Sequence, residues 1–239
     1  MNDKNKEIQR KRMAGYFIEA TQSIIEKEGI ENLTIRKISS LAGYNSATLY
    51  NYFDDLNQLI SFSLIDSVLE YFIHINNSIT TENESYITFL LTWREYGIFS
   101  FKKPEIYTYV FYSKHSNEVL GQIGHYLKLF PNPHLSEGSE VQRRILGKSI
   151  EERDDLICGP CIADGYFDKK DKKYILDFCY ALHLGMCAKV KSGNFENLEA
   201  VTELYLDYLI DFLLTHTKIP CKKEQLLNYI LKYNNVSKI

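Results

Sequence analysis

Helix-breaking residues are scarce in this chain, which has 5 prolines and 12 glycines among 239 residues. So few breakers argue against a collagen-like, linker-like or disordered chain, and they leave room for long helices. No run of about 18 uncharged apolar residues occurs, so we expect neither a membrane span nor a membrane partner. The basic residues near the N-terminus are followed by no apolar stretch, which excludes a secretory signal.

Cysteine is also scarce, with five thiols, an odd number, in a chain too long to need disulfides for stability. This usage favours reduced thiols and a cytoplasmic protein. The net charge is −3, so the protein as a whole is not a general binder of nucleic acid. Any DNA contact must therefore depend on where individual charges lie.

Apolar residues recur at helical spacing along the chain, and no segment alternates over a strand's length, so the sequence predicts an all-α protein. The first stripe runs from Met13 to Ile25 and ends at Gly29, a suitable C-cap. Further helices are expected over residues 33–42, 45–52, 55–75, 86–99, 104–112, 117–130, 140–166, 172–190, 196–215 and 223–233. We expect a loop at 134–138, a disturbance at Gly159-Pro160, and a helix N-cap at Asp54 or Asp55.

Two of these short helices, joined at Gly43, form a candidate helix-turn-helix. Ser39 is small enough for the second helix to cross the first, and Gly43 suits a turn that needs positive φ. Thr34 and Asn45 are good N-caps for the two helices. The buried side is expected to consist of Ile35, Ile38, Leu41 and Leu49.

This motif and the helix before it resemble the TetR/AcrR family of transcriptional regulators. The resemblance begins at Phe17-x-x-Ala20, passes Gly29 and Leu33-Thr34, and continues through Thr48-Leu49-Tyr50 and Tyr52-Phe53 to Leu59. It covers about the first quarter of the chain. It implies a three-helix DNA-binding head, a larger helical body that binds a ligand and dimerises, and repression relieved by a small molecule.

The resemblance predicts a helix-turn-helix DNA-binding domain over residues 8–54, with its motif at 33–52, and an effector-binding and dimerisation domain over 55–239. The family usually has Lys where this chain has Ser46 and Leu56, and Gly where it has Ala47, so some phosphate contacts are missing. The basic N-terminal residues and the Arg36-Lys37 pair are candidates to replace them. Tyr50 suits a half-buried position and a phosphate contact equally well. The residues expected at DNA are Thr34, Arg36, Lys37, Tyr44, Asn45, Ser46, Ala47, Thr48, Tyr50 and Asn51.

Aromatic residues crowd the middle of the chain, where a helical bundle could line a cavity with them. Each one taken alone is more typical of core packing, so their assignment to a pocket rests on the resemblance. The residues expected around an apolar or aromatic effector are Phe89, Trp93, Tyr96, Tyr109, Tyr112, His115 and Phe167. No His pair has metal-ligand spacing, so neither a metal nor a cofactor is expected.

The helix over 198–214 is apolar across so wide an arc that it needs two neighbours, its own core and a partner. The resemblance implies that it and the helix over 172–190 pair with their copies in a homodimer, which suits a palindromic operator. The expected interface residues are Ile175, Cys179, Leu182, Met186, Tyr205, Tyr208, Leu209 and Phe212.

Cys158-Gly159-Pro160-Cys161 has the spacing of thioredoxin-like redox sites. Those sites follow a hydrophobic strand, whereas the acidic residues 151–155 precede this motif, so no enzyme is expected. The favoured function is a repressor that is released from DNA by a small molecule. The alternatives are a redox- or metal-responsive regulator that senses through Cys158 and Cys161, and a DNA-bound adaptor without an effector.

Overall fold

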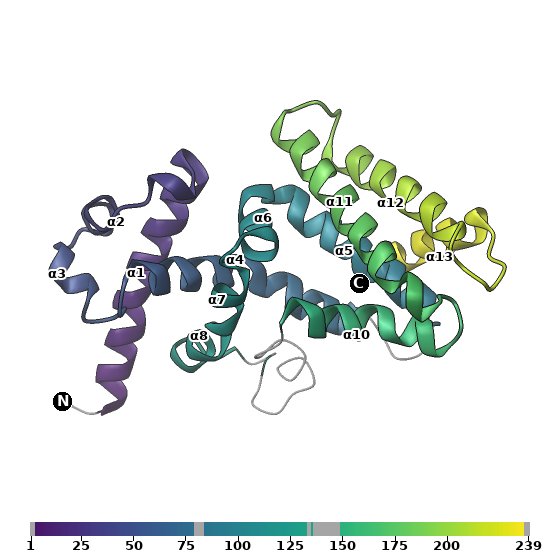
Figure 1. Ribbon diagram of the computed structural model, residues 1–239. Helices are drawn as coiled ribbons and strands as arrows, with labels where there is room; N and C mark the ends of the chain where they lie inside the picture. The colour runs from purple at the N-terminus through teal and green to yellow at the C-terminus, as the bar shows by residue number, and fades with distance from the viewer. Residues whose placement is uncertain (1–2, 79–83, 133–134, 136–148, 237–239) are drawn as a thin grey trace. The chain divides into compact units, whose positions relative to one another are not determined.

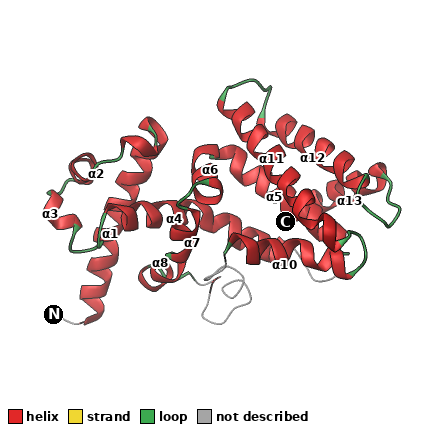
Figure 2. Ribbon diagram, in the orientation of Figure 1, coloured by secondary structure: helices red, strands yellow, loops and turns green. Residues whose placement is uncertain are grey.

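The computed structural model describes residues 3–78, 84–132, 135 and 149–236. Every regular element among these residues is helical, so the predicted all-α class is confirmed (Figure 2). The helices labelled in Figure 1 are α1 (Asp3–Glu28), α2 (Ile35–Ala42), α3 (Ser46–Leu49), α4 (Leu56–Ser78), α5 (Ser85–Lys102), α6 (Pro104–Tyr112), α7 (Ser116–Gly121), α8 (Ile123–Leu129), α10 (Ile150–Ala163), α11 (Lys172–Lys191), α12 (Leu198–Leu214) and α13 (Lys223–Val236). The loop expected at 134–138, Leu135 apart, and the first part of the helix expected over 140–166 lie outside the described residues.

The chain divides into two compact units. The first unit contains Met1–Glu70 and Tyr109–Lys148, and the second contains Tyr71–Thr108 and Ser149–Ile239. Helices α4 and α6 therefore contribute residues to both units. The expected boundary at 54/55 differs from this division, because α7 and α8 belong to the same unit as the helices before residue 54.

We call α1, α2 and α3 the head. Its core is the buried face of α1, where Ala14, Phe17 and Ile24 are almost inaccessible to solvent. Helix α1 begins at Asp3, well before the apolar stripe, because the Lys, Glu, Gln and Arg residues there favour helix as strongly as most apolar residues do. It ends at Glu28, and Gly29 follows with a φ of 88°, so this predicted C-cap position has the expected positive φ.

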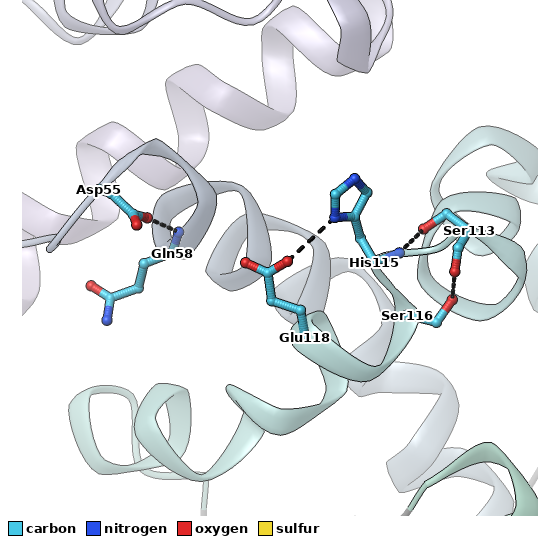
Figure 3. Close-up of polar contacts among 6 residues, drawn as sticks. All are labelled: Asp55, Gln58, Ser113, His115, Ser116 and Glu118. Atoms are coloured by element: carbon cyan, nitrogen blue, oxygen red, sulfur yellow. Dashed lines mark hydrogen bonds and ion pairs between the residues drawn. The ribbon is translucent and has the colours of Figure 1, made fainter.

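The first unit also contains α4 up to Glu70, α7, α8 and the end of α6. Asp55 caps α4, because its Oδ1 accepts a hydrogen bond from the Gln58 backbone N–H at 2.8 Å (Figure 3). On α8, the Tyr126 ring lies 5.7 Å from the Phe62 ring of α4, and its hydroxyl donates to Asp66. Asp66 also accepts from Gln22 of α1 at 2.8 Å, so one carboxylate joins α1, α4 and α8.

The single helix expected over 117–130 is wrong, because the chain forms α7 and α8 with a break at Gln122. Gly121 just before the break has low helix propensity, which favours an end there. Before α7, Ser116 Oγ donates to the Ser113 carbonyl at 2.7 Å, and His115 Nδ1 lies 3.3 Å from the Glu118 carboxylate (Figure 3). These contacts fix the turn that leads into α7.

Helix α5 is the centre of the second unit and packs against α10, α11 and α12. Its residues are buried on nearly every side, from Tyr86 to Phe101. At Gly97 a Cβ atom would lie 3.0 Å from the Tyr205 ring, so glycine is what lets α12 approach α5 this closely. Helix α10 continues past Pro160 to Ala163, and a capping box between Ser149 and Glu152 starts it.

The C-terminal helix α13 is anchored to α12. The Lys223 ammonium lies 2.5 Å from Asp207 and 2.7 Å from Asp211, and Leu226 and Ile230 of α13 are buried. In the described residues, Leu56–Ile75 of α4 is the one stretch long and apolar enough to cross a membrane, and half of it is buried by protein.

Candidate nucleic-acid interface

Helix α2 begins where the sequence predicts. Thr34 has extended backbone angles, and its side-chain oxygen accepts a hydrogen bond from the Lys37 N–H at 3.2 Å, as an N-cap does. Ile38 and Ser39 are buried beneath the helix. Leu41 is 54% exposed, so its assignment to the buried side is wrong.

The turn between α2 and α3 depends on Gly43. This residue has φ 80° and ψ 22°, a left-handed conformation that costs residues with a Cβ about 1 kcal/mol or more. Its N–H donates to the Ser40 carbonyl at 3.2 Å, and the Tyr44 N–H donates to the Ser39 carbonyl at 2.9 Å. These two bonds satisfy carbonyls at the end of α2 and fix the direction in which the chain enters α3.

Helix α3 is capped by Asn45. Asn45 Oδ1 accepts from the Thr48 N–H at 2.9 Å and from the Thr48 hydroxyl at 3.0 Å. The regular helix covers only Ser46–Leu49, shorter than the expected 45–52, and turns closed by the N–H groups of Tyr52 and Phe53 on the Leu49 carbonyl continue it. Leu49 and Phe53 are fully buried, so the short helix is held by its apolar side.

All ten residues expected at DNA lie at the surface of the head. Thr48 is half-buried, and the other nine are exposed. Tyr50 is 54% exposed, so it is not a core residue. The motif therefore presents accessible groups at the N-terminus of α2, and again from Tyr44 to the turn after α3.

Tyr16 of α1 is an additional aromatic residue at this surface that the sequence analysis did not single out. Its ring lies 6.2 Å from the Tyr44 ring in a stacked arrangement, and Tyr44 also lies 5.6 Å from Phe17. The contacts hold Tyr44 at the start of α3. The available signal was a large aromatic residue directly before Phe17, one position outside the buried stripe.

The cations of α2 differ in their surroundings. Lys37 Nζ lies 2.7 Å from a Glu28 carboxylate oxygen, so this expected DNA contact is engaged in an ion pair. Arg36 is exposed at the first turn of α2. No acidic or basic residue occurs within α3 itself, so charge for phosphate contact must come from neighbouring elements.

The seven residues expected around an effector are divided between the two units. Phe89, Trp93, Tyr96 and Phe167 are buried in the second unit, where the Phe89 ring lies 5.5 Å from Phe167 and 6.3 Å from Trp93. Tyr109, Tyr112 and His115 belong to the first unit, where Tyr109 and His115 stack at 5.8 Å. No single unit brings all seven together.

Two polar groups, Glu95 and His183, are buried inside the second unit. Glu95 is buried, and its carboxylate lies 2.8 Å from His74 Nε2 and pairs with Arg94. His183 is fully buried, with its ring 4.2 Å from Tyr96 and its Nε2 2.6 Å from Ser100 Oγ. Burial lowers the pKa of His183 to about 3, so the imidazole is neutral at physiological pH. The sequence signal for Glu95 is that Arg94 and Glu95 stand next to each other in a segment otherwise rich in apolar and aromatic residues.

The residues expected at a dimer interface separate into a buried and an accessible group. Five of them, Ile175, Cys179, Met186, Tyr205 and Leu209, are buried in the chain's own core. Leu182 and Phe212 are half-buried, and Tyr208 is 48% exposed. On the accessible side, the Phe178 and Phe212 rings stack with centroids 3.5 Å apart, beside Tyr174.

The Cys158-Gly159-Pro160-Cys161 motif lies in the second half of α10, with both thiols fully buried. Burial raises the pKa of Cys158 to about 11 and that of Cys161 to about 12. Reactive thiols are accessible and have lowered pKa values, so this environment is the opposite of a redox site. Within the part of the chain that the structure describes, no three Cys, His, Asp or Glu residues are grouped to hold a metal ion.

Comparison with solved structures shows the fold. The chain is similar to a Clostridium perfringens protein assigned to the regulation of fatty acid metabolism, with TM-score 0.55 and 14% identity over 87% of this chain and 100% of that one. It is also similar to a TetR transcription regulator from Haloarcula marismortui, with TM-score 0.54 and 13% identity over 87% and 99% of the two chains. The superantigen PfiT matches with TM-score 0.52 and 16% identity over 87% and 97%, so the fold alone does not fix a function.

The sequence match to a known family is confined to the N-terminal part of the chain. Residues 17–61 match the family of bacterial regulatory proteins named tetR, and this segment contains the capped helices and the Gly43 turn described above. No curated protein matches the chain. The N-terminal helix-turn-helix head therefore matches the tetR family of bacterial regulatory proteins, and every regular element in the rest of the described chain is helical.

Proposed function

We propose that this protein is a cytoplasmic repressor that binds a palindromic operator as a homodimer and is released by a small apolar or aromatic effector. The observation that carries the proposal is the geometry of the motif. Thr34 and Asn45 cap the two helices, Gly43 makes the turn between them, and α3 is exposed on one side and buried on the other. A helix presented in this way can enter the major groove.

The roles of the ten surface residues follow from their chemistry. Ser46 and Ala47 are small and lie in the first turn of α3, so the helix can approach base edges closely. Arg36 comes before α3 in the chain and Tyr50 directly after it, and both can donate to phosphates, which would fix the register of the head on DNA. Thr48 and Asn45 bond to each other, so their first role is to hold the shape of α3.

Dimerisation is supported by an accessible aromatic face on α11 and α12. Its members are Tyr174, Phe178, Tyr208 and Phe212, and the ring contacts among three of them keep the face in one shape. Exposed apolar patches of this kind mark interaction surfaces. A second copy that buries the same face would form a two-fold dimer, which matches a palindromic site.

The effector is assigned to the helical body because aromatic side chains and a few buried polar groups are concentrated there. Phe89, Trp93 and Tyr96 supply apolar surface, and Glu95 and His183 supply polar groups among them. Ligand pockets combine these two kinds of side chain. The single tryptophan, Trp93, makes ligand binding measurable by its fluorescence.

The test is selection of bound sequences from random double-stranded DNA, followed by affinity measurements at several salt concentrations. We expect enrichment of an inverted repeat. Arg36→Ala should weaken binding to all sequences similarly and reduce the salt slope by roughly one unit. Failure to enrich any sequence, with a folded dimer present, contradicts the proposal. An enriched repeat, together with no ligand that changes Trp93 emission, favours the adaptor without an effector.

A further inference from the structure

A groove in the first unit lies on a face of α1 that the head does not use for its core. The residues at i, i+3, i+4, i+7, i+8 and i+11 share a side of the helix, and here they are Ile8, Lys11, Arg12, Gly15, Tyr16 and Glu19. Together with Phe130 at the end of α8, they line an open groove of about 510 Å³. Ligand sites have volumes of about 300–1,000 Å³, so the groove has room for a small molecule.

The floor and one wall of this groove are defined by the fold. A Cβ atom placed on Gly15 would have no atom within 4 Å, so the space over this residue is open, and we call Gly15 the floor of the groove. Phe130 forms the wall and stacks on Tyr126 with ring centroids 5.1 Å apart. Tyr126 is itself held by Asp66 and Phe62, so the wall has a fixed position relative to α1 and α4.

The chemistry of the lining is amphipathic and cationic. Ile8 is 43% exposed and Tyr16 is 46% exposed, so both present apolar surface to the groove. The Lys11 ammonium lies 5.8 Å from the centre of the Phe130 ring, and Arg12 is beside it in the chain. Glu19 is the single acid in the lining, so the cations are in excess.

We propose that this groove binds a small amphipathic carboxylate, at a site separate from the effector site of the body. The apolar part of the ligand would lie against Ile8, Tyr16 and Phe130, over the open floor at Gly15. Its carboxylate would pair with Lys11 and Arg12, because an anion complements the excess of positive charge. A ligand with both features buries the exposed apolar groups and satisfies the cations together.

The test uses naphthalene-2-carboxylate as the probe and isothermal titration calorimetry of the full-length protein. We expect Gly15→Leu to weaken binding at least tenfold, because the new side chain fills the floor of the groove. Gly121→Leu is the matched control, since Gly121 is also on a helix of the first unit with no atom within 4 Å of a Cβ. The neutral analogue 2-naphthylmethanol should bind at least tenfold more weakly than the carboxylate. Lys11→Gln with Arg12→Gln should remove this preference without filling the groove.

Trp93 fluorescence separates this site from the effector site. Trp93 is buried in the second unit, so quenching of its emission reports ligand in the body. Calorimetric binding that Gly15→Leu abolishes, with Trp93 emission unchanged, supports the groove whatever the fate of the effector proposal. Binding that Gly15→Leu and Gly121→Leu leave equally intact overturns the groove proposal, as does the absence of binding heat at millimolar probe. Equal affinity for the carboxylate and the alcohol overturns the assignment of an anionic ligand.

Discussion

Lys37 and Glu28 form an ion pair that links the first turn of α2 to the last turn of α1, with 2.7 Å between the ammonium nitrogen and the carboxylate oxygen. Both side chains remain about half exposed, at 46% and 47%. A phosphate that approaches Lys37 must therefore compete with Glu28. Arg36 and Lys37 are neighbours in sequence, but we expect them to contribute differently to DNA binding.

We predict that Glu28→Gln strengthens DNA binding a few-fold and steepens the salt dependence by up to one unit, because Lys37 becomes available to a phosphate. The measurement is fluorescence anisotropy of a labelled operator at several salt concentrations. Glu26→Gln on the same helix is the control for the change of net charge. If both variants bind the operator more tightly by the same factor, the effect is due to overall charge, and the ion pair has no specific role.

A second prediction separates the cap of α3 from its DNA surface. Asn45→Asp retains a good N-cap, so the free energy of unfolding measured in urea should change by less than about 0.5 kcal/mol. The new negative charge should weaken operator binding about tenfold or more. Asn45→Ala should instead destabilise the protein by about 1 kcal/mol, because the Thr48 N–H and hydroxyl lose Asn45 Oδ1 as an acceptor. If Asn45→Asp binds the operator with unchanged affinity, Asn45 does not lie at the DNA interface.

The third prediction compares two adjacent residues of α12. Tyr208 is 48% exposed and Leu209 is fully buried. Tyr208→Glu should give a folded monomer, because it charges the accessible face alone. Leu209→Glu should unfold the protomer, because a buried unpaired carboxylate costs several kcal/mol. Sedimentation velocity and circular dichroism at about 10 μM distinguish these results, and a dimeric Tyr208→Glu variant would mean that the interface lies elsewhere.

The fourth prediction concerns acid stability. The pKa of His183 falls from its ordinary 6.5 to about 3 on folding, because the ring is buried. His183 therefore becomes protonated below pH 6.5 in the unfolded chain but only below about pH 3 in the folded chain. The free energy of unfolding decreases as the pH falls through this window. The loss should be about 2 kcal/mol at about pH 5.

Urea midpoints at neutral pH and at about pH 5 measure this loss. His183→Phe keeps an aromatic ring beside Tyr96 and Phe101 but has no proton to bind. It should be less stable at neutral pH, because the hydrogen bond between Ser100 and the His183 ring is lost, and should lose less stability on acidification. An identical pH dependence in both proteins would assign the acid sensitivity to other groups.

The local features of the motif could be predicted because each depends on a few consecutive residues. Thr34 and Asn45 are caps by virtue of their side chains alone, and Gly43 is the residue that a left-handed turn requires. The bounds of α11, to within one residue, and the start of α13 after Pro220 likewise follow from clear stripes and breakers, whereas α13 ends three residues beyond the expected 233. Asp55 was one of two candidates, and the structure selects it as the cap of α4.

Features that depend on contacts between distant segments could not be predicted. Ile175, Cys179 and Met186 form an apolar stripe, but the sequence pattern does not show whether the stripe packs against the core of its own chain or against a second copy. The structure places these residues in the core. Lys37 pairs with Glu28, which lies on another helix. Phe130, which lines the groove with residues of α1, lies more than 100 residues further along the chain. Periodicity identifies an apolar face without identifying what covers it.

The burial of the thiols has a practical consequence for spectroscopy. Cys158, Cys161, Cys179 and Cys187 are at most 1% exposed, whereas Cys221, just before α13, is partly accessible. A maleimide added to the folded protein should therefore react with one equivalent of thiol per chain, and four more should react only in denaturant. The natural sequence thus provides a single attachment point for a fluorophore or spin label, so distances can be measured between copies without removing any cysteine.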